Sequence, residues 1–339
     1  MSSRAIVCAL VASFAAGCGD DVVASGPDAS EPLDAGNDAA LVRRDAGPPI
    51  VEPSLFDCTS AGATAPATSP ARVTPVPVAC ATDPTCRTAM VAGHRGAGGE
   101  LGRIAPEDTL AAYRAAIVLG VDFVETDPRP TADGVIVNMH DTTVDRTTDG
   151  TGTVLEMTFD AVRALHIRTT FRGDYSCERV PTLEEILVQC KGRAHVLVDA
   201  NKTDRVDLLV RAIQSADALD WAIFDTSDVA KIDAALAIEP GLHVMIRPST
   251  VDEITVQLDH FAPLLPVIVE LENGVVLAGA PIVHARGTRA FTDVFAADAL
   301  FNVAEDSSGY ETLLDQGLDI PQTDRPDAVL ALFARRGLR

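Results

Sequence analysis

The stretch MVAGHRGAGGELGRIAPEDTLAAYRAAIVLGVDFVETD, residues 90–127, contains a short apolar run, an amphipathic segment and a second apolar run. Short apolar runs are typical of buried strands, and the segment DTLAAYRAAIVLG (108–120) has the apolar spacing of a helix. A strand, a helix and a second strand in this order indicate a parallel pair joined by a crossover helix. The stretch therefore predicts an α/β fold that begins near residue 89.

The same alternation continues towards the C-terminus. The further strand-like runs are GVIVNMH (134–140), HVLVDA (195–200), WAIFD (221–225), HVMIR (243–247), PVIVELE (266–272) and RAFTDV (289–294). Roughly eight repeats in about 250 residues favour a (β/α)8 TIM barrel over residues 89–339. A doubly wound sheet is the alternative, but no Gly-rich phosphate loop with the required spacing follows the first run.

The N-terminus has the pattern of an export signal. Arg4 precedes an apolar run, residues 5–16, which is too short to span a bilayer and ends in small residues before Cys18. This end resembles a bacterial lipobox, so we expect a lipoprotein signal peptide over 1–17 and a lipid on Cys18. An ordinary secretory signal is the alternative. The expected location is outside the cytoplasm, anchored to a bacterial membrane on the periplasmic face or in the outer membrane.

Two segments separate this signal from the predicted barrel. Residues 18–57 are rich in Asp, Ala, Gly and Pro and predict a disordered acidic tether. Residues 58–88 predict an N-terminal extension pinned by a disulfide among its three cysteines, and a Cys177–Cys190 disulfide is a second expectation. The net charge of −22 excludes nucleic acid as an expected partner, since phosphate backbones require Lys and Arg.

Ionisable residues follow several of the predicted strands. They are His94, Arg95, Glu125, Asp127, His140, Asp141 and Asp199. Because the carboxyl ends of barrel strands converge on the face that carries active sites, we expect these side chains to meet. Glu125 and Asp127 are two residues apart on a strand, so their side chains point to the same side. Two such carboxylates repel each other unless a cation lies between them, and oxygen ligands suit Ca²⁺ or Mg²⁺.

The segment TADG (131–134) predicts a turn between two of these strands. Too few residues separate the strands for a parallel crossover, so a hairpin is expected. With the tip between Asp133 and Gly134, Asp127 lies opposite His140. This register predicts that His140 returns to the carboxylates.

Eight motifs in order along residues 90–330 resemble the glycerophosphodiester phosphodiesterase family. They are GHRG (93–96), PEDT (106–109), VETD (124–127), ADGV (132–135), MHD (139–141), VDRTTDGTG (144–152), VPTLEE (180–185) and TDRPD (323–327). The resemblance implies a distorted (β/α)8 barrel and a metal-dependent phosphodiesterase. It also implies that His94 and His140 are the acid and base, that Arg95 binds phosphate, and that Glu125 and Asp127 bind the metal.

Three residues depart from the family pattern. Asp199 stands where the family has a glutamate, and we expect it to be the third metal ligand. Asn201 stands where the family has a lysine, and Lys202 is displaced by one. We expect Lys202 to reach the phosphate through a bulge at the strand end. Phe291 replaces a family tryptophan and is expected to alter the substrate pocket.

Three functions are compatible with these residues. The first is hydrolysis of small or lipid glycerophosphodiesters to an alcohol and glycerol 3-phosphate. The second is a phospholipase-D-like activity on lysophospholipid or sphingomyelin, and the third is a surface binding protein without catalysis. Glu107 is expected either to complement a helix dipole in a first turn or to line the site.

Overall fold

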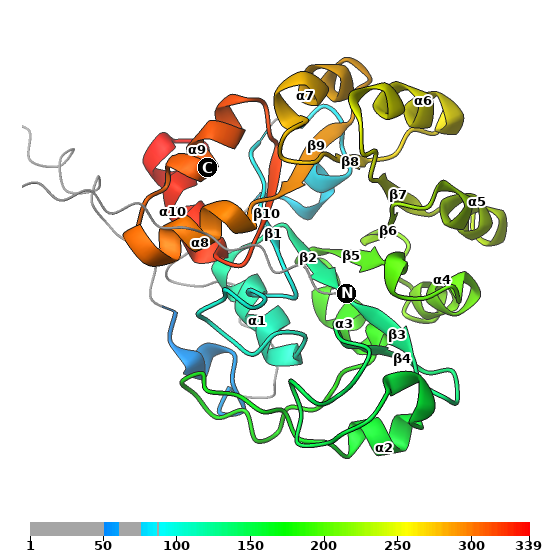
Figure 1. Ribbon diagram of the computed structural model, residues 1–339, viewed down its shortest axis with the longest axis vertical. Helices are drawn as coiled ribbons and strands as arrows, with labels where there is room; N and C mark the ends of the chain where they lie inside the picture. Colours follow the sequence, from blue (N-terminus) through cyan, green and yellow to red (C-terminus); the bar gives the residue numbers. More distant parts are fainter. Residues whose placement is uncertain (1–50, 61–75, 87) are drawn as a thin grey trace, which may run out of the picture. The chain divides into compact units, whose positions relative to one another are not determined.

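The computed structural model describes residues 51–60, 76–86 and 88–339, all within the unit Arg43–Arg339. The predicted signal peptide, Cys18 and most of the predicted tether lie outside the described residues. Eight parallel strands close into a barrel in the order β1-β10-β9-β8-β7-β6-β5-β2 (Figure 1). The strands are β1 (Ala92–Gly93), β2 (Phe123–Thr126), β5 (His195–Asp199), β6 (Ala222–Thr226), β7 (His243–Ile246), β8 (Ile268–Glu270), β9 (Arg289–Asp293) and β10 (Ile320–Thr323). The predicted barrel is confirmed.

Helices surround this barrel and connect its strands (Figure 1). They are α1 (Leu110–Leu119), α2 (Phe159–Arg163), α3 (Leu183–Cys190), α4 (Val206–Ser215), α5 (Val229–Ile238), α6 (Val251–Phe261), α7 (Val276–Ala285), α8 (Phe295–Ala304), α9 (Ser308–Asp315) and α10 (Pro326–Arg336). Several begin at a side-chain cap: Thr109 accepts a hydrogen bond from the Ala112 amide, and Thr182 forms a capping box with Glu185. Among the described residues, no helix is long and apolar enough to cross a membrane.

The barrel interior holds one apolar residue from each strand. These residues form a single buried cluster with Met90 and consist of Ala92, Phe123, Leu197, Ile223, Met245, Ile268, Phe291 and Ile320. Their sequence neighbours, such as Val124 and Val196, belong to the core between the strands and the helices. Strand alternation therefore separates an inner and an outer core. Phe291 lies in the inner core with no exposed surface, so the expectation that it shapes the substrate pocket is wrong.

One predicted strand lies outside the barrel. The run at 134–140 contains β4 (Ile136–Asn138), which pairs antiparallel with β3 (Pro128–Pro130) in a separate two-stranded sheet. The eighth barrel strand is β10, which was not predicted, because Pro321 and Gln322 interrupt its apolar pattern.

The hairpin is confirmed, but its expected register is wrong by one residue. Pro128 pairs with Asn138, and the Met139 amide donates to the Asp127 carbonyl, so Met139 rather than His140 lies opposite Asp127. The loop conformation causes this shift in register. The Thr131 amide donates a hydrogen bond to the Val135 carbonyl, and Gly134 has φ +82°. Three residues rather than two form the tip, as in hairpins with a glycine in the left-handed region.

The N-terminal extension contains one internal disulfide and is joined to the barrel domain by a second. Cys58 is bonded to Cys177, and Cys80 is bonded to Cys86. Cys190 is buried and free, so the expected Cys177–Cys190 disulfide is wrong. Cys190 ends α3 and packs in the outer core, which leaves Cys177 to pair with the extension.

Candidate active site

A polar residue stands two positions after each apolar residue of the inner core. In barrel order these residues are His94, Glu125, Asp199, Asp225, Arg247, Glu270, Asp293 and Gln322. Side chains two apart on a strand point to the same side, so all eight face the mouth at the carboxyl end of the barrel. The expectation that strand ends bring ionisable residues together is confirmed for Glu125, Asp127 and Asp199.

Three carboxylates form one cluster in this mouth. Oxygens of Glu125, Asp127 and Asp199 all lie within 4.8 Å of one another, and the three side chains are buried. Burial, and then the nearby charges of Asp127 and Asp108, raise the pKa of Glu125 well above its usual range. Oδ2 of Asp127 is buried without a hydrogen-bond partner. An all-oxygen set with an unsatisfied buried oxygen fits a hard divalent cation.

His94 is held by the loop that follows β10. Its Nδ1 lies 2.6 Å from Oδ1 of Asp324, and its Nε2 lies 3.9 Å from Glu125. Asp324 also accepts hydrogen bonds from the amides of Gly99 and Leu101. A Cβ at Gly99 would lie 2.6 Å from the His94 Nδ1, so only glycine permits this approach. The Asp324 carboxylate therefore orients the ring and leaves Nε2 facing the carboxylate cluster.

His140 is positioned through its backbone and one ring nitrogen. Its amide donates to Asp108, and its Nδ1 lies 2.9 Å from Asp141. The Arg129 guanidinium donates to the His140 carbonyl at 2.6 Å and to the Lys202 carbonyl at 3.4 Å. Arg129 thus joins the hairpin to the segment after β5.

Asn138 joins the same hairpin to the end of β2. Its amide oxygen accepts from the Asp127 amide at 2.7 Å, and its Nδ2 donates to Asp108 and to the Tyr113 hydroxyl. Tyr113 in turn donates to the Glu125 carbonyl. This network fixes both metal-binding candidates of β2 relative to His140.

Arg95 lies among acidic side chains. Its amide donates to Glu125, its Nη1 donates to Glu107 at 2.9 Å, and its Nε lies 3.5 Å from Asp127. Glu107 also accepts from Arg146 at 2.5 Å. Burial opposes ionisation of Glu107, but the hydrogen bond from Arg146 and the charge of Arg95 outweigh it and lower the pKa.

The position of Glu107 decides between its two interpretations. Helix α1 begins at Leu110 with Thr109 as its cap, so Glu107 precedes the helix and is not in its first turn. The expected role in complementing the helix dipole is therefore wrong, and Glu107 lines the site.

Lys202 and Asn201 point to different partners. Strand β5 ends at Asp199, and a short 3-10 helix, Ala200–Lys202, follows it. The ammonium of Lys202 lies 3.1 Å from Asp127 and 4.0 Å from Asp199. The Asn201 side chain instead accepts hydrogen bonds from Thr226 and Ser227 at the end of β6. This 3-10 turn, rather than the expected bulge in the strand, brings the Lys202 ammonium to the carboxylate cluster.

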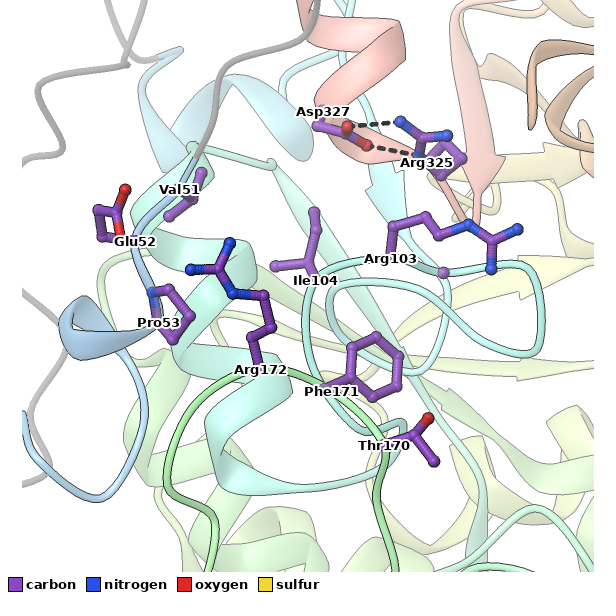
Figure 2. A pocket seen from close by; sticks show the side chains of 11 residues that line it. Val51, Glu52, Pro53, Arg103, Ile104, Thr170, Phe171, Arg172, Arg325 and Asp327 are labelled. Atoms are coloured by element: carbon purple, nitrogen blue, oxygen red, sulfur yellow. Dashed lines mark hydrogen bonds and ion pairs between the residues drawn. The ribbon is translucent and has the colours of Figure 1, made fainter. Parts of the chain in front are cut away.

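Two open cavities adjoin each other at Thr170 and Phe171. A cleft of about 540 Å³ is lined by Glu107 and Arg146 together with the apolar side chains of Ile167 and Phe171. A cavity of about 580 Å³ lies between residues 51–53 and the loops that carry Arg103, Ile104 and Arg172 (Figure 2). The second cavity holds none of the carboxylates or histidines of the mouth, so we place the chemistry at the mouth and its adjoining cleft.

Sequence reasoning missed the residues that hold the site together. Asp324 orients His94, Asp108 and Asn138 fix the hairpin, and Arg129 joins the hairpin to Lys202. Asp324 and Asp108 lie in the motifs TDRPD and PEDT, so the resemblance included both residues, but it did not indicate which side chains they contact. No pattern in the sequence marked Arg129.

The part of the chain that carries this site is similar to known proteins. Residues 94–231 match the model of the glycerophosphoryl diester phosphodiesterase family. A segment of 138 residues is 41% identical to glycerophosphodiester phosphodiesterase 1 of Bos taurus, covering 40% of this chain and 38% of that protein. A segment of 97 residues is 40% identical to a glycerophosphodiester phosphodiesterase of Caldanaerobacter subterraneus, covering 29% of this chain and 38% of that protein. The chain thus spans less than half the length of these relatives.

Solved structures share the barrel. A glycerophosphoryl diester phosphodiesterase from Parabacteroides distasonis superposes with a TM-score of 0.64 at 22% identity, over 76% of this chain and 90% of that one. An Oleispira antarctica phosphodiesterase in complex with the product sn-glycerol-3-phosphate superposes with a TM-score of 0.59 at 22% identity, over 72% of this chain and 97% of that one. The matched family model includes His94, Glu125, Asp127, His140 and Asp199, so residues 94–231 are similar to the glycerophosphoryl diester phosphodiesterase family, and the solved structures share the fold.

Proposed function

We propose that this chain hydrolyses glycerophosphodiesters to an alcohol and glycerol 3-phosphate with the help of one divalent cation, Mg²⁺ or Ca²⁺. The observation that carries the proposal is the cluster of Glu125, Asp127 and Asp199 beside a histidine oriented by Asp324. These three carboxylates would hold the cation. When bound, the cation would neutralise negative charge on the phosphate oxygens.

Arg95 and Lys202 would bind the phosphate. Both side chains already lie beside Asp127: Nε of Arg95 is 3.5 Å from its Oδ2, and Nζ of Lys202 is 3.1 Å from its Oδ1. Their positions beside the cluster support contacts to phosphate oxygens that gain charge as the diester reacts.

The two histidines would transfer protons at their Nε2 atoms. Each ring donates a hydrogen bond from Nδ1 to an aspartate, His94 to Asp324 and His140 to Asp141. The other ring nitrogen, Nε2, is therefore the atom available for proton transfer. One histidine would remove the proton of the nucleophile, which is either water or the glycerol hydroxyl of the substrate, and the other would give a proton to the leaving alkoxide. If the glycerol hydroxyl attacks, water then opens the cyclic phosphate to give glycerol 3-phosphate. Arg146 holds Asp141 with a hydrogen bond of 2.7 Å, which keeps the His140 ring in place.

Turnover of glycerophosphocholine with and without a chelator tests the proposal. We expect turnover that stops in the chelator and returns with Mg²⁺ or Ca²⁺. Lysophosphatidylcholine is the comparison substrate, and a preference for it would favour the phospholipase-D-like alternative. Turnover that persists in metal-stripped protein would overturn the metal requirement.

We also propose that Cys18 carries a lipid that anchors the exported chain to a bacterial membrane, on the evidence of the lipobox-like sequence. Cys18→Ser should move the protein from the membrane fraction to the soluble fraction or leave it uncleaved. A cleaved Cys18→Ser protein that still requires detergent would contradict a lipid on this residue.

A further inference from the structure

Five of the eight polar residues at the barrel mouth have no part in the proposed mechanism. They follow the inner core on β6, β7, β8, β9 and β10, and we call them the polar arc: Asp225, Arg247, Glu270, Asp293 and Gln322. Asp225 is fully buried and Gln322 is 5% exposed. Arg247, Glu270 and Asp293 are partly buried, so this half of the mouth is lined by buried and half-buried polar groups.

Arg247 donates hydrogen bonds to both oxygens of Asp225 but leaves one oxygen of Glu270 without a hydrogen bond. Its Nε donates to Asp225 at 2.7 Å, and its Nη2 donates to the second oxygen of the same carboxylate. Oε2 of Glu270 lies 2.9 Å from the same Nε. Because that nitrogen carries a single proton, which points to Asp225, the Glu270 oxygen is left without a hydrogen bond.

Gln322 shows the same incomplete pairing. Its Nε2 donates to Asp293 at 2.6 Å, which fixes the orientation of the amide. Its Oε1 is buried and has no hydrogen-bond partner. The arc therefore contains two buried acceptors, Glu270 Oε2 and Gln322 Oε1, and buried acceptors without donors are rare in folded proteins.

The position of the arc connects it to the reaction. Asp293 interacts electrostatically with His94 and with Arg247, and Arg247 lies 3.9 Å from Asp199. A substrate held at the carboxylate cluster would thus extend over the arc on the side of His94. Each unpaired acceptor can accept a hydrogen bond from one hydroxyl group, so two hydroxyls would satisfy both, whereas an alkyl chain would leave them buried and unpaired.

We propose that the polar arc is a hydroxyl-binding subsite in which Glu270 and Gln322 accept hydrogen bonds from the hydroxyls of one moiety of the diester. This inference rests on the proposed function and names the part of the substrate that the site selects. The hydroxyls belong either to the glycerol or to the esterified alcohol. The subsite disfavours diesters that place an acyl or alkyl chain over the arc.

Binding of small phosphates tests the subsite without turnover. We would measure the affinity for sn-glycerol 3-phosphate and for propyl phosphate by calorimetry in the presence of Mg²⁺. The parent protein should prefer glycerol 3-phosphate by about 10-fold or more, because a site built for hydroxyls rejects the analogue that lacks them. Gln322→Met keeps the side-chain volume and should bring this ratio close to one.

A second variant and a control protect the test. Glu270→Met should reduce the same ratio, and it serves as the test if Gln322→Met does not fold. Gln214→Met, on the exposed surface of α4, should keep the parent ratio. The subsite would be overturned if the parent bound both phosphates with equal affinity or bound neither. It would also be overturned if the variants lost the same factor of affinity for both.

Kinetics distinguish the two sources of hydroxyls and separate this inference from the proposed function. If the variants lose the preference for glycerophosphocholine over its propyl analogue, the glycerol moiety occupies the arc. If they lose only the preference for glycerophosphoglycerol over glycerophosphoethanol, the alcohol occupies it. Either result supports the subsite. A parent that binds with the expected preference but does not turn over would overturn the proposed function and leave the subsite supported.

Discussion

The two halves of the barrel mouth are built from the same strand positions but pair their charges differently. On the β1, β2 and β5 side, Glu125, Asp127 and Asp199 face one another, and the cations beside them come from beyond the strand ends. On the β6 to β10 side, Arg247 is paired with Asp225 inside the barrel itself. The first half brings three carboxylates together for a cation and places Lys202 beside them for a phosphate, whereas the second half offers unpaired acceptors suited to hydroxyls. We call the first half the catalytic half.

Removal of either histidine should produce the largest loss of activity. His94→Ala and His140→Ala are each expected to lower kcat by about 10²–10⁴-fold, the usual contribution of a positioned acid or base. The double variant should lose less than the product of the two losses, since both residues act in one reaction. His260→Ala, an exposed histidine paired with Asp233, is the matched control. Near-normal kcat in either single variant would remove that histidine from the mechanism.

Substitutions of Lys202 and Asn201 test which of these two side chains belongs to the catalytic half. Lys202→Ala should lower kcat/KM by about 10²-fold, which corresponds to about 3 kcal/mol for one preorganised group in a water-poor site. Asn201→Ala should be nearly silent in kcat, because its side chain faces Thr226 and Ser227. Lys191→Ala on the surface is the control. A severe loss in Asn201→Ala with a silent Lys202→Ala would reverse the assignment.

Asp298 provides a smaller test, in stability and its pH dependence. Burial raises the pKa of Asp298 to about 6, and its carboxylate accepts hydrogen bonds from Tyr310 and from the Asp324 amide behind His94. The folded protein holds this proton more tightly than the unfolded chain. The contribution of Asp298 to stability is therefore greatest below about pH 4 and falls as pH rises to about 6, by roughly 3 kcal/mol.

Asp298→Asn cannot titrate and should lack this dependence. Denaturant unfolding of both proteins from pH 4 to 7 would measure it as the difference between their free energies of unfolding. A difference that stays constant across this range would contradict the raised pKa.

The sequence predicted the barrel well but not its boundaries. Seven of the expected runs are barrel strands, because a parallel strand buried on both sides needs a continuous apolar run. The run at 134–140 misled because a hairpin strand packed on a core has the same composition. Strand β10 was missed because Gln322, which faces the mouth, breaks the apolar pattern.

The candidate site was predicted only where one strand carries the chemistry. Glu125 and Asp127 were paired correctly because strand periodicity places them on one side. The contacts of Asp324 to His94, 230 residues apart, and of Arg129 to Lys202 depend on how the barrel closes. The polar arc draws one residue from each of five strands, so no local pattern revealed it.

Crystals of the protein soaked with Mn²⁺, a hard cation that yields anomalous scattering, test the central claim most directly. The account predicts one strong anomalous peak within bonding distance of Glu125, Asp127 and Asp199, and its loss in Asp199→Ala. It predicts no peak among Asp225, Glu270 and Asp293, because Arg247 already forms ion pairs with Asp225 and Glu270 at the place where a cation would lie. A peak in the polar arc, or none at the three carboxylates at saturating Mn²⁺, would contradict the division of the mouth into a catalytic and a hydroxyl-binding half.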